Sequence, residues 1–274
     1  RPACPQCLTP APVGAQCVDC VRADSDRPAA AVPGRPAIGP PGIATRRPIA
    51  TYTLMAVNIA VFGYCLWAAG SLSDVAVCEP LLHGELVRGN VFLGQYWRLL
   101  TAGFLHYGVL HLAVNMISLY LLGRDLEKVL GTGRYLLVYL TALLGGSAAV
   151  MVFQADDTRS AGASGAIFGL MGAMLVVVLR LRMSATPVLT IIGVNLVMSF
   201  TLTGVSLPAH VGGLLFGAAA AAVQVYAPAI VPSGNARTIT AVGYGGAAAL
   251  LVIALGISIL VALTYTGAVL VYVR

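Results

Sequence analysis

The hydrophobic residues of this chain gather into seven long runs that are separated by more polar stretches. Each run holds roughly 20 residues, the length that an α-helix needs to cross the hydrocarbon core of a bilayer. The runs lie at 51–69, 105–123, 134–153, 163–179, 187–203, 207–226 and 239–265. The pattern predicts an all-α polytopic membrane protein. The last run carries no charged residue, and we expect it to serve packing or anchoring.

The composition agrees with a membrane protein. Of the 274 residues, 58% are hydrophobic and only 9% are charged, and the mean hydropathy is +0.88. Ordinary soluble domains carry roughly 25% charged residues. The net charge of +6 would suggest nucleic acid in a soluble protein, but here the basic residues stand beside the apolar runs. We therefore read the charge as membrane topology and expect no nucleic-acid partner.

The basic residues also predict the orientation. They fall on one side of the membrane if the N-terminus is cytoplasmic, because cytoplasmic loops collect Lys and Arg. These residues are Arg46, Arg47, Arg124, Lys128, Arg134, Arg180, Arg182 and Arg237. Asp156 and Asp157 then fall on the outer side. The chain begins with Arg1 and shows no signal peptide, so we expect a fragment that inserts through its first span.

The connection between the first two runs, at 70–104, is unusually long and partly apolar. It is expected to lie in the outer interface, where Trp and Tyr residues settle. Trp97 and Arg98 stand in it, and on sequence alone an ordinary interfacial anchor explains them as well as any functional role. His83, in the same connection, is not expected to take part in chemistry.

Two Cys-x-x-Cys pairs open the chain. Their spacing is typical of a structural zinc knuckle, in which four thiolates surround the metal. The ligands would be Cys4, Cys7, Cys17 and Cys20. Two disulfides or redox pairs are the alternative, but a reducing cytoplasm favours zinc. We expect residues 1–21 to form this knuckle, truncated upstream, and the Pro/Ala/Gly-rich residues 22–48 to form a linker.

A serine set among small residues opens the fourth run, at Gly162-Ala163-Ser164-Gly165. Helix packing is the simplest interpretation, because small residues let membrane helices approach closely. Ser164 also shares a helical side with Phe168 and Gly172, so a hydroxyl and a small-residue surface face the same neighbour.

The sixth run offers a matching surface. His210 begins it, and Gly213 and Gly217 follow at offsets of three and seven, on the same helical face. Ser164 and His210 both stand near the outer ends of their runs, so they are expected at similar depth. A serine that faces a histidine on close-packed helices is a nucleophile with its general base. No Asp or Glu is evident to orient the imidazole, so the pair would be a dyad.

The second run adds two polar residues, His111 and Asn115, which share one helical face. Together with the Ser164 amide they could bind the oxyanion of a tetrahedral intermediate. Cross-linking of helices by the two side chains is the structural alternative.

Together these residues resemble the rhomboid family of intramembrane serine proteases. The resemblance covers about residues 48–226. It rests on Trp97-Arg98, on Phe104-Leu105-His106 with His111 and Asn115, on Gly162-Ala163-Ser164-Gly165, and on Ala209-His210-Val211-Gly212-Gly213 with Gly217. Some bacterial members carry a tyrosine four residues after the serine, where this chain has Phe168. Its ring can still pack against His210, without a hydroxyl contact. The Cys-rich head resembles that of actinobacterial members.

The resemblance implies a six-helix core at 49–226, followed at 227–274 by a linker and a seventh, C-terminal helix. It implies Ser164 as nucleophile, His210 as base, and an oxyanion site from His111, Asn115 and the Ser164 amide. It also implies that the fifth helix and the loop before His210 flex to admit substrate. Supporting positions are His106, Gly162, Gly165, Phe168, Gly213, Gly217, Trp97 and Arg98.

The expected function is cofactor-independent cleavage of single-span or polytopic membrane proteins near the outer face of a bacterial plasma membrane. A catalytically inactive rhomboid-like protein that escorts membrane clients is the alternative, although such relatives typically lack the serine or the histidine. A transporter is disfavoured by the lack of paired repeats and of carboxylates within the spans. The sequence names no substrate and leaves the oligomeric state and the role of the zinc knuckle open.

Overall fold

The computed structural model describes residues 8–10, 15–17, 47–202, 204–231 and 235–272. Side chains are described for those of these residues that lie between 47 and 265. The chain divides into two units, Arg1–Ala37 and Ile38–Arg274. In the first unit, β1 (Leu8–Pro10) pairs antiparallel with β2 (Ala15–Cys17), and Leu8 lies opposite Cys17. Cys4, Cys7 and Cys20 lie outside the described residues, and Cys17 is described by its backbone alone. The zinc knuckle therefore stays a prediction, as do the domain boundaries.

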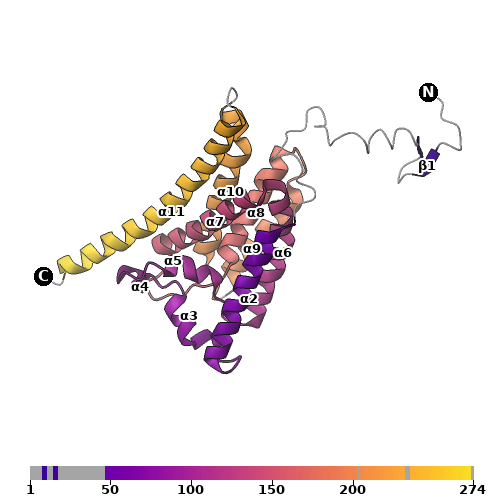
Figure 1. Ribbon diagram of the computed structural model, residues 1–274. Coiled ribbons are helices and arrows are strands. Elements are labelled where there is room, and N and C mark those ends of the chain that lie inside the picture. Colours follow the sequence, from indigo (N-terminus) through magenta and orange to yellow (C-terminus); the bar gives the residue numbers. More distant parts are fainter. Residues whose placement is uncertain (1–7, 11–14, 18–46, 203, 232–234, 273–274) are drawn as a thin grey trace. The chain divides into compact units, whose positions relative to one another are not determined.

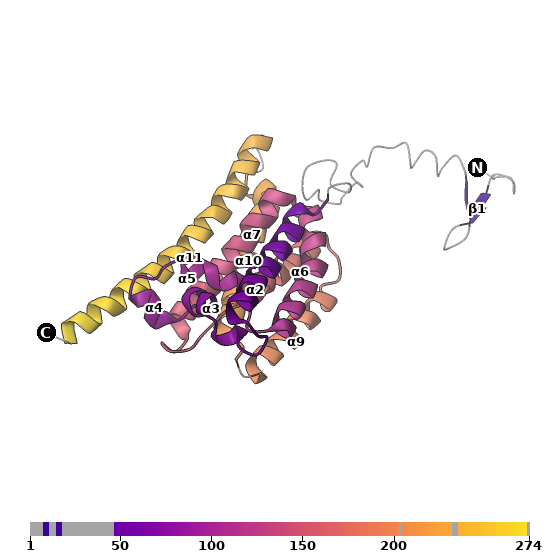
Figure 2. The same ribbon diagram turned by 60° about the horizontal axis from the view of Figure 1, so that its bottom comes forward.

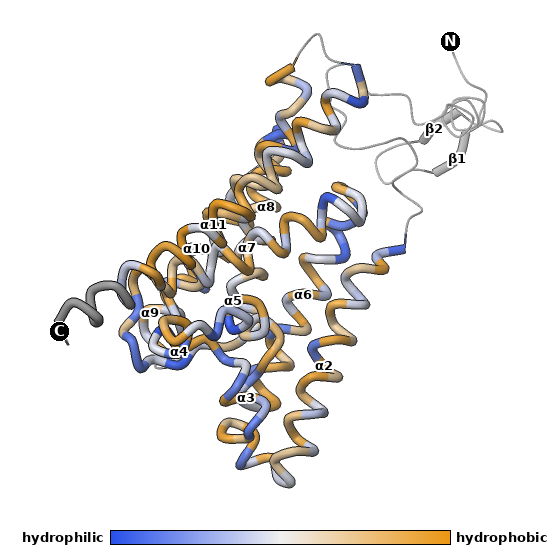
Figure 3. The backbone as a smooth tube through the Cα atoms, turned by 60° about the vertical axis from the view of Figure 1, so that its left-hand side comes forward, coloured by the Kyte–Doolittle hydropathy of each residue, from blue (hydrophilic) through white to orange (hydrophobic). Residues whose placement is uncertain are grey.

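The second unit is helical, which confirms the predicted fold class (Figure 1). Its long helices are α2 (Ile49–Ala69), α6 (Val109–Leu130), α7 (Thr132–Phe153), α8 (Ser164–Arg180), α9 (Thr186–Thr201), α10 (Leu207–Ile230) and α11 (Ala236–Tyr272). Among the described residues, five helices are long and apolar enough to cross a membrane, whereas α8 and α9 are shorter, with 17 and 16 residues. Apolar residues predominate along most of these helices (Figure 3). The chain is an integral, multi-pass membrane protein.

The second helix begins later and ends later than the hydrophobic pattern predicts. A short 3₁₀ helix, η4 (Ala102–Phe104), and an extended segment precede Val109. At the other end α6 continues to Leu130 and includes Glu127, which the sequence places in a loop. The buried Glu127 carboxylate accepts hydrogen bonds from the Ala50 and Thr51 amides, at 3.0 and 2.8 Å. It caps the start of α2, where helix amides otherwise have no partner.

The long connection before α6 is folded, as its apolar residues predict. It forms η3 (Val75–Val77), α3 (Glu79–Gly84), α4 (Arg88–Phe92) and α5 (Arg98–Thr101). These short helices gather beside the bundle, where α3 contacts α2 and α4 contacts α11 (Figures 1 and 2). The seventh helix is held there by Tyr265, whose ring stacks on Phe92 with centroids 3.9 Å apart. The Tyr265 hydroxyl also donates to Asp156, at 2.7 Å.

Glycines bring α8 and α10 into direct backbone contact. A Cβ on Gly217 would overlap the backbone of Gly169, and one on Gly213 would overlap the carbonyl of Gly165. Such approach is possible only where side chains are absent. The faces of small residues that the sequence predicts on these two helices are therefore in contact. This contact brings Ser164 and His210 close together. Helix α7, which is buried over much of its length, packs against both.

Candidate active site

The candidate nucleophile and base lie within hydrogen-bonding distance. Ser164 is the first residue of α8, and His210 lies in the first turn of α10. The Ser164 hydroxyl oxygen and His210 Nε2 are 2.7 Å apart, although 46 residues separate them along the chain. This distance suits proton transfer from the hydroxyl to the imidazole. The structure thus brings together the two residues that the sequence singles out.

Two side chains fix the plane of the His210 ring. Phe168, one turn after Ser164, stacks on it with centroids 4.1 Å apart and an interplanar angle of 14°. On the opposite edge, His210 Nδ1 lies 2.6 Å from the Ser199 hydroxyl of α9. The expected aromatic packing of Phe168 is confirmed, whereas the contact with Ser199 was not expected.

His111 and Asn115 face the same space as Ser164. A Cβ built on Gly162 would lie 2.8 Å from His111 Nε2 and 3.6 Å from the Ser164 hydroxyl oxygen. The Tyr107 amide donates to His111 Nδ1 over a long 3.4 Å, which leaves Nε2 to carry the ring proton. Asn115 Nδ2 donates one hydrogen to the His111 carbonyl at 2.8 Å and has a second one to offer.

These groups line one cavity of about 210 Å³. Its polar lining includes His111, Asn115, Ser164, Ser199 and His210. Because Ser164 starts its helix, its backbone amide has no intrahelical acceptor. The positive end of the α8 dipole lies at the same place, which favours negative charge beside the nucleophile. The cavity therefore combines a candidate nucleophile, a candidate base and three potential oxyanion donors.

The segment before Ser164 is tied to the outer connection. Leu86 and Ser160 exchange two backbone hydrogen bonds of 2.8 and 2.9 Å, and the Gly162 amide donates to the Ala102 carbonyl at 2.9 Å. Gly162 has φ of +132°, a conformation that favours glycine. Ser164 is therefore positioned from both sides, by this segment and by α8.

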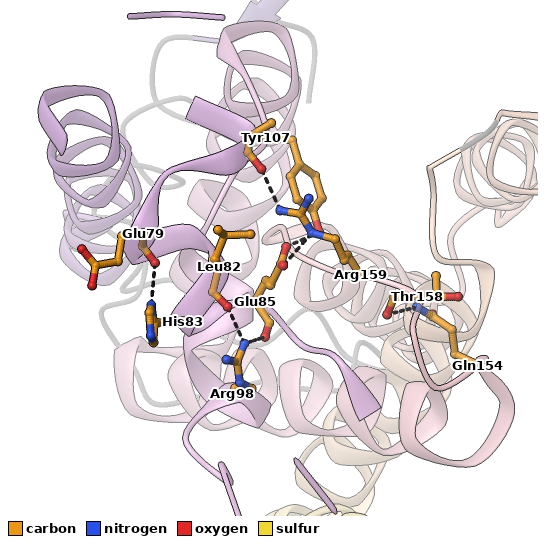
Figure 4. A network of polar contacts seen from close by, with 10 residues as sticks. Glu79, Leu82, His83, Glu85, Arg98, Tyr107, Gln154, Thr158 and Arg159 are labelled. Atoms are coloured by element: carbon orange, nitrogen blue, oxygen red, sulfur yellow. Dashed lines mark hydrogen bonds and ion pairs between the residues drawn. The ribbon is translucent and has the colours of Figure 1, made fainter. Parts of the chain in front are cut away.

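A buried carboxylate reinforces the same connection (Figure 4). The Glu85 side chain, 3% exposed, accepts a hydrogen bond of 2.6 Å from Arg159 and one of 3.2 Å from the Tyr107 hydroxyl. The bond to Glu85 raises the pKa of Arg159. Burial, with the Glu85 charge, raises the pKa of Tyr107, so its hydroxyl stays protonated and donates.

The remaining predicted positions lie around this framework. Arg98 is buried and donates to the carbonyls of Leu82 and Glu85, at 2.8 and 2.6 Å, while Trp97 is half-exposed and donates to the His83 carbonyl. Both residues hold the outer connection together without touching the dyad.

His106 is almost fully buried, and its ring lies edge-on to His111 with centroids 5.0 Å apart. Burial, together with the nearby His111, lowers the pKa of His106 to about 3. His106 is therefore a neutral packing partner of His111.

Sequence reasoning missed three groups that support the site: Ser199, Glu85 and Arg159. The only available signal for Glu85 and Arg159 was their opposite charges, 74 residues apart, and that does not identify them as a pair. Ser199 offered none, since serines in membrane helices commonly bond to their own backbone.

Known proteins match a large part of this chain. A family model described as Rhomboid domain matches residues 93–227. Rhomboid protease GluP of Bacillus subtilis (strain 168) is 38% identical over 181 residues, which cover 64% of this chain and 35% of that protein. RHOMBOID-like protein 6, mitochondrial, of Arabidopsis thaliana is 40% identical over 140 residues, which cover 48% and 44%. The chain thus spans less than half the length of these two relatives.

A third relative is covered more fully. The rhomboid-type protein YdcA of Bacillus subtilis (strain 168) is 36% identical over 160 residues, which cover 56% of this chain and 79% of that protein. The matched stretch of the family model contains Ser164, His210, His111 and Asn115. With this coverage and these site residues, the chain belongs to the rhomboid family.

Proposed function

We propose that this protein is an intramembrane serine protease that hydrolyses peptide bonds of other membrane proteins with a Ser164–His210 dyad. The observation that carries the proposal is the 2.7 Å contact between the Ser164 hydroxyl and His210 Nε2 in a cavity that several polar side chains help to line. The name of Rhomboid protease GluP agrees with a proteolytic role.

In the first half of the reaction, the Ser164 oxygen attacks the scissile carbonyl carbon while His210 Nε2 takes the hydroxyl proton. The carbonyl oxygen becomes an oxyanion, and His111 Nε2–H, the Asn115 amide and the Ser164 backbone amide are placed to donate to it. His210 then returns its proton to the leaving nitrogen. The amine product departs and Ser164 carries the acyl group.

In the second half, water attacks the acyl carbon and His210 again accepts the proton. The proton returns to the Ser164 oxygen as that bond breaks, and a carboxylic acid product leaves. Water must therefore reach a site between membrane helices, which the polar side chains within the cavity lining favour. The substrate must expose an amide free of helical hydrogen bonds, so helix-weakening residues are expected near its cut site.

The catalytic test uses the purified chain in lipid with fluorescent single-span reporters. We expect wild type to cut and both Ser164→Ala and His210→Ala to lose at least about 10³-fold in kcat while remaining folded. Mass spectrometry of the products locates the bond that is cut. Equal cleavage by either variant, or a wild type that cuts none of several reporters, would reject the proposal.

We propose further that the N-terminus is cytoplasmic in a bacterial plasma membrane and that the site opens toward the outer face. Support comes from the charges: Arg124 and Lys128 near one end of the bundle, and Asp156 and Asp157 near the other. In a background in which the six native cysteines are replaced, a cysteine introduced as Asp157→Cys should react with a membrane-impermeant maleimide on intact cells. Lys128→Cys should react only after lysis, and the reverse result would invert the topology.

The escort function gains no support from the site. A protein that only binds clients needs no histidine at hydrogen-bonding distance from a serine, whereas a hydrolase does.

A further inference from the structure

His210 has a second hydrogen bond, on the edge that faces away from Ser164. Its Nδ1 lies 2.6 Å from the Ser199 hydroxyl oxygen, and both residues are buried. The same hydroxyl donates to the Asn195 carbonyl one turn earlier on α9, also at 2.6 Å. Ser164, His210, Ser199 and Asn195 thus form a chain of hydrogen bonds through three helices.

The number of protons in this chain fixes the direction of each bond. A serine hydroxyl has one hydrogen, and a carbonyl oxygen can only accept. The Ser199 hydrogen is therefore used by the bond to Asn195, and only lone pairs remain to face His210. Nδ1 must then carry the imidazole proton. The lone pair of the neutral ring lies on Nε2, directed at the hydroxyl of Ser164.

We propose that Ser199 is a positioning residue that holds His210 in the one neutral tautomer able to accept a proton from Ser164. This inference rests on the proposed protease function. Ser199 takes the orienting role that a carboxylate has in a catalytic triad, without supplying a negative charge. It acts through His210 and need not touch the substrate.

Ordinary helix packing explains only part of the arrangement. A serine in a membrane helix commonly bonds to the carbonyl four residues earlier, and Thr190 does so on the same helix, with the Thr186 carbonyl at 2.9 Å. That habit accounts for the bond to Asn195 and leaves the contact with His210 unexplained. Thr190 is exposed and lies outside the cavity, so it provides a matched control.

The location of Ser199 makes the orientation of His210 depend on α9. Ile192 and Ser199 are the buried residues of this helix. A helix with so few buried side chains is weakly anchored. Movement of α9 away from α10 would remove the acceptor at Nδ1, leaving both tautomers of His210 available. The position of α9 would then control the fraction of His210 side chains that present a free lone pair on Nε2 to Ser164.

The first test measures how fast a fluorophosphonate probe labels Ser164 in the purified full chain. We expect Ser199→Ala to slow labelling about tenfold, the effect of losing one hydrogen bond of ordinary strength. Ser199→Thr keeps a hydroxyl and should restore the rate, and Thr190→Ala should label like wild type. An unchanged rate in Ser199→Ala overturns the inference. A wild type that is not labelled at Ser164 rejects the protease function itself.

The second test observes the tautomer directly, with no need for activity. In protein labelled with ¹⁵N-histidine, the His210 nitrogen shifts distinguish a proton on Nδ1 from one on Nε2. We expect the Nδ1–H form in wild type and in Ser199→Thr, and a mixture in Ser199→Ala. The same pure tautomer in all three proteins overturns the inference even if labelling is slower, because a packing defect would then explain the rate.

Discussion

The carboxylate of Glu85 and the guanidinium of Arg159 lie 2.6 Å apart and join the outer connection to the segment that leads into Ser164. Because Glu85 is buried, removing its partner leaves a charge that is poorly compensated. We expect Arg159→Met to lower the free energy of unfolding by about 1–3 kcal/mol and to lower cleavage activity. Denaturant titration in detergent measures the first effect.

A double variant separates charge from packing. Glu85→Gln with Arg159→Met removes both charges, and it should recover part of the stability that Arg159→Met loses. If the double variant is no more stable than Arg159→Met alone, the buried charge is not the cause.

The contact between α8 and α10 makes a prediction about glycine. In Gly217→Ala the new methyl group would overlap the Gly169 backbone, so the helices must separate. We expect the free energy of unfolding to fall by about 1–3 kcal/mol. We also expect a loss of cleavage activity, because Ser164 and His210 belong to the two helices that separate. Gly256→Ala on α11, where a Cβ would have no neighbour within 4 Å, is the control. Equal effects of the two variants would contradict the packing argument.

The donors of the oxyanion site should act on the transition state. Removal of one such donor costs about 10²–10³-fold in kcat in other enzymes. We expect Asn115→Ala and His111→Ala to lower kcat in this range with little change in KM, as measured by reporter cleavage. A rise in KM at constant kcat would show that the two side chains bind the ground state instead.

Acid should destabilise the protein through His106. The folded pKa of about 3 lies below the ordinary value of 6.5, so the unfolded chain binds a proton that the folded chain rejects. Stability from this residue is therefore complete above pH 6.5 and falls by about 1.4 kcal/mol per pH unit toward pH 3. Thermal unfolding in detergent at several pH values measures the slope.

Two variants identify the residue responsible for that slope. His106→Gln cannot bind the proton and should lose stability less steeply as the pH falls. His83→Gln, which changes an exposed histidine, should follow wild type. A slope that is the same in all three proteins would exclude His106 as its source.

Chelation should separate the cysteine segment from catalysis. If Cys4, Cys7, Cys17 and Cys20 hold zinc, a chelator will release the metal and unfold that segment. We expect reporter cleavage by the helical unit to persist, since the described residues that line its cavity all belong to that unit. Metal analysis before and after chelation supplies the occupancy, and loss of cleavage on stripping would contradict this independence.

Much of the helical unit could be predicted because its determinants are local. Runs of about 20 apolar residues mark membrane helices, and the glycine spacing after Ser164 and His210 marks faces that can meet. The error at residues 105–108 has a local cause as well. Hydropathy does not distinguish an apolar helix from an apolar extended segment. In this chain the extended segment ends at Gly108, and the helix begins at Val109.

The contacts that the sequence did not predict are tertiary contacts between segments far apart in the chain. The contact between Glu85 and Arg159 depends on how the outer connection folds, and the contact between Ser199 and His210 depends on which face α9 presents to α10. No periodicity in the sequence records the rotation of one helix about its axis relative to another. A serine that orients a catalytic base and one that merely satisfies its own helix therefore look alike in sequence.

Gly162 gives the site a vulnerability of its own. A methyl group on this residue would lie 2.8 Å from His111 Nε2 and 3.6 Å from the Ser164 hydroxyl oxygen, close to both the proposed nucleophile and a proposed oxyanion donor. In Gly162→Ala, the added methyl group would therefore occupy part of the cavity beside Ser164 and His111. The absence of a side chain at this position therefore leaves room beside Ser164 and His111 that any larger residue would fill.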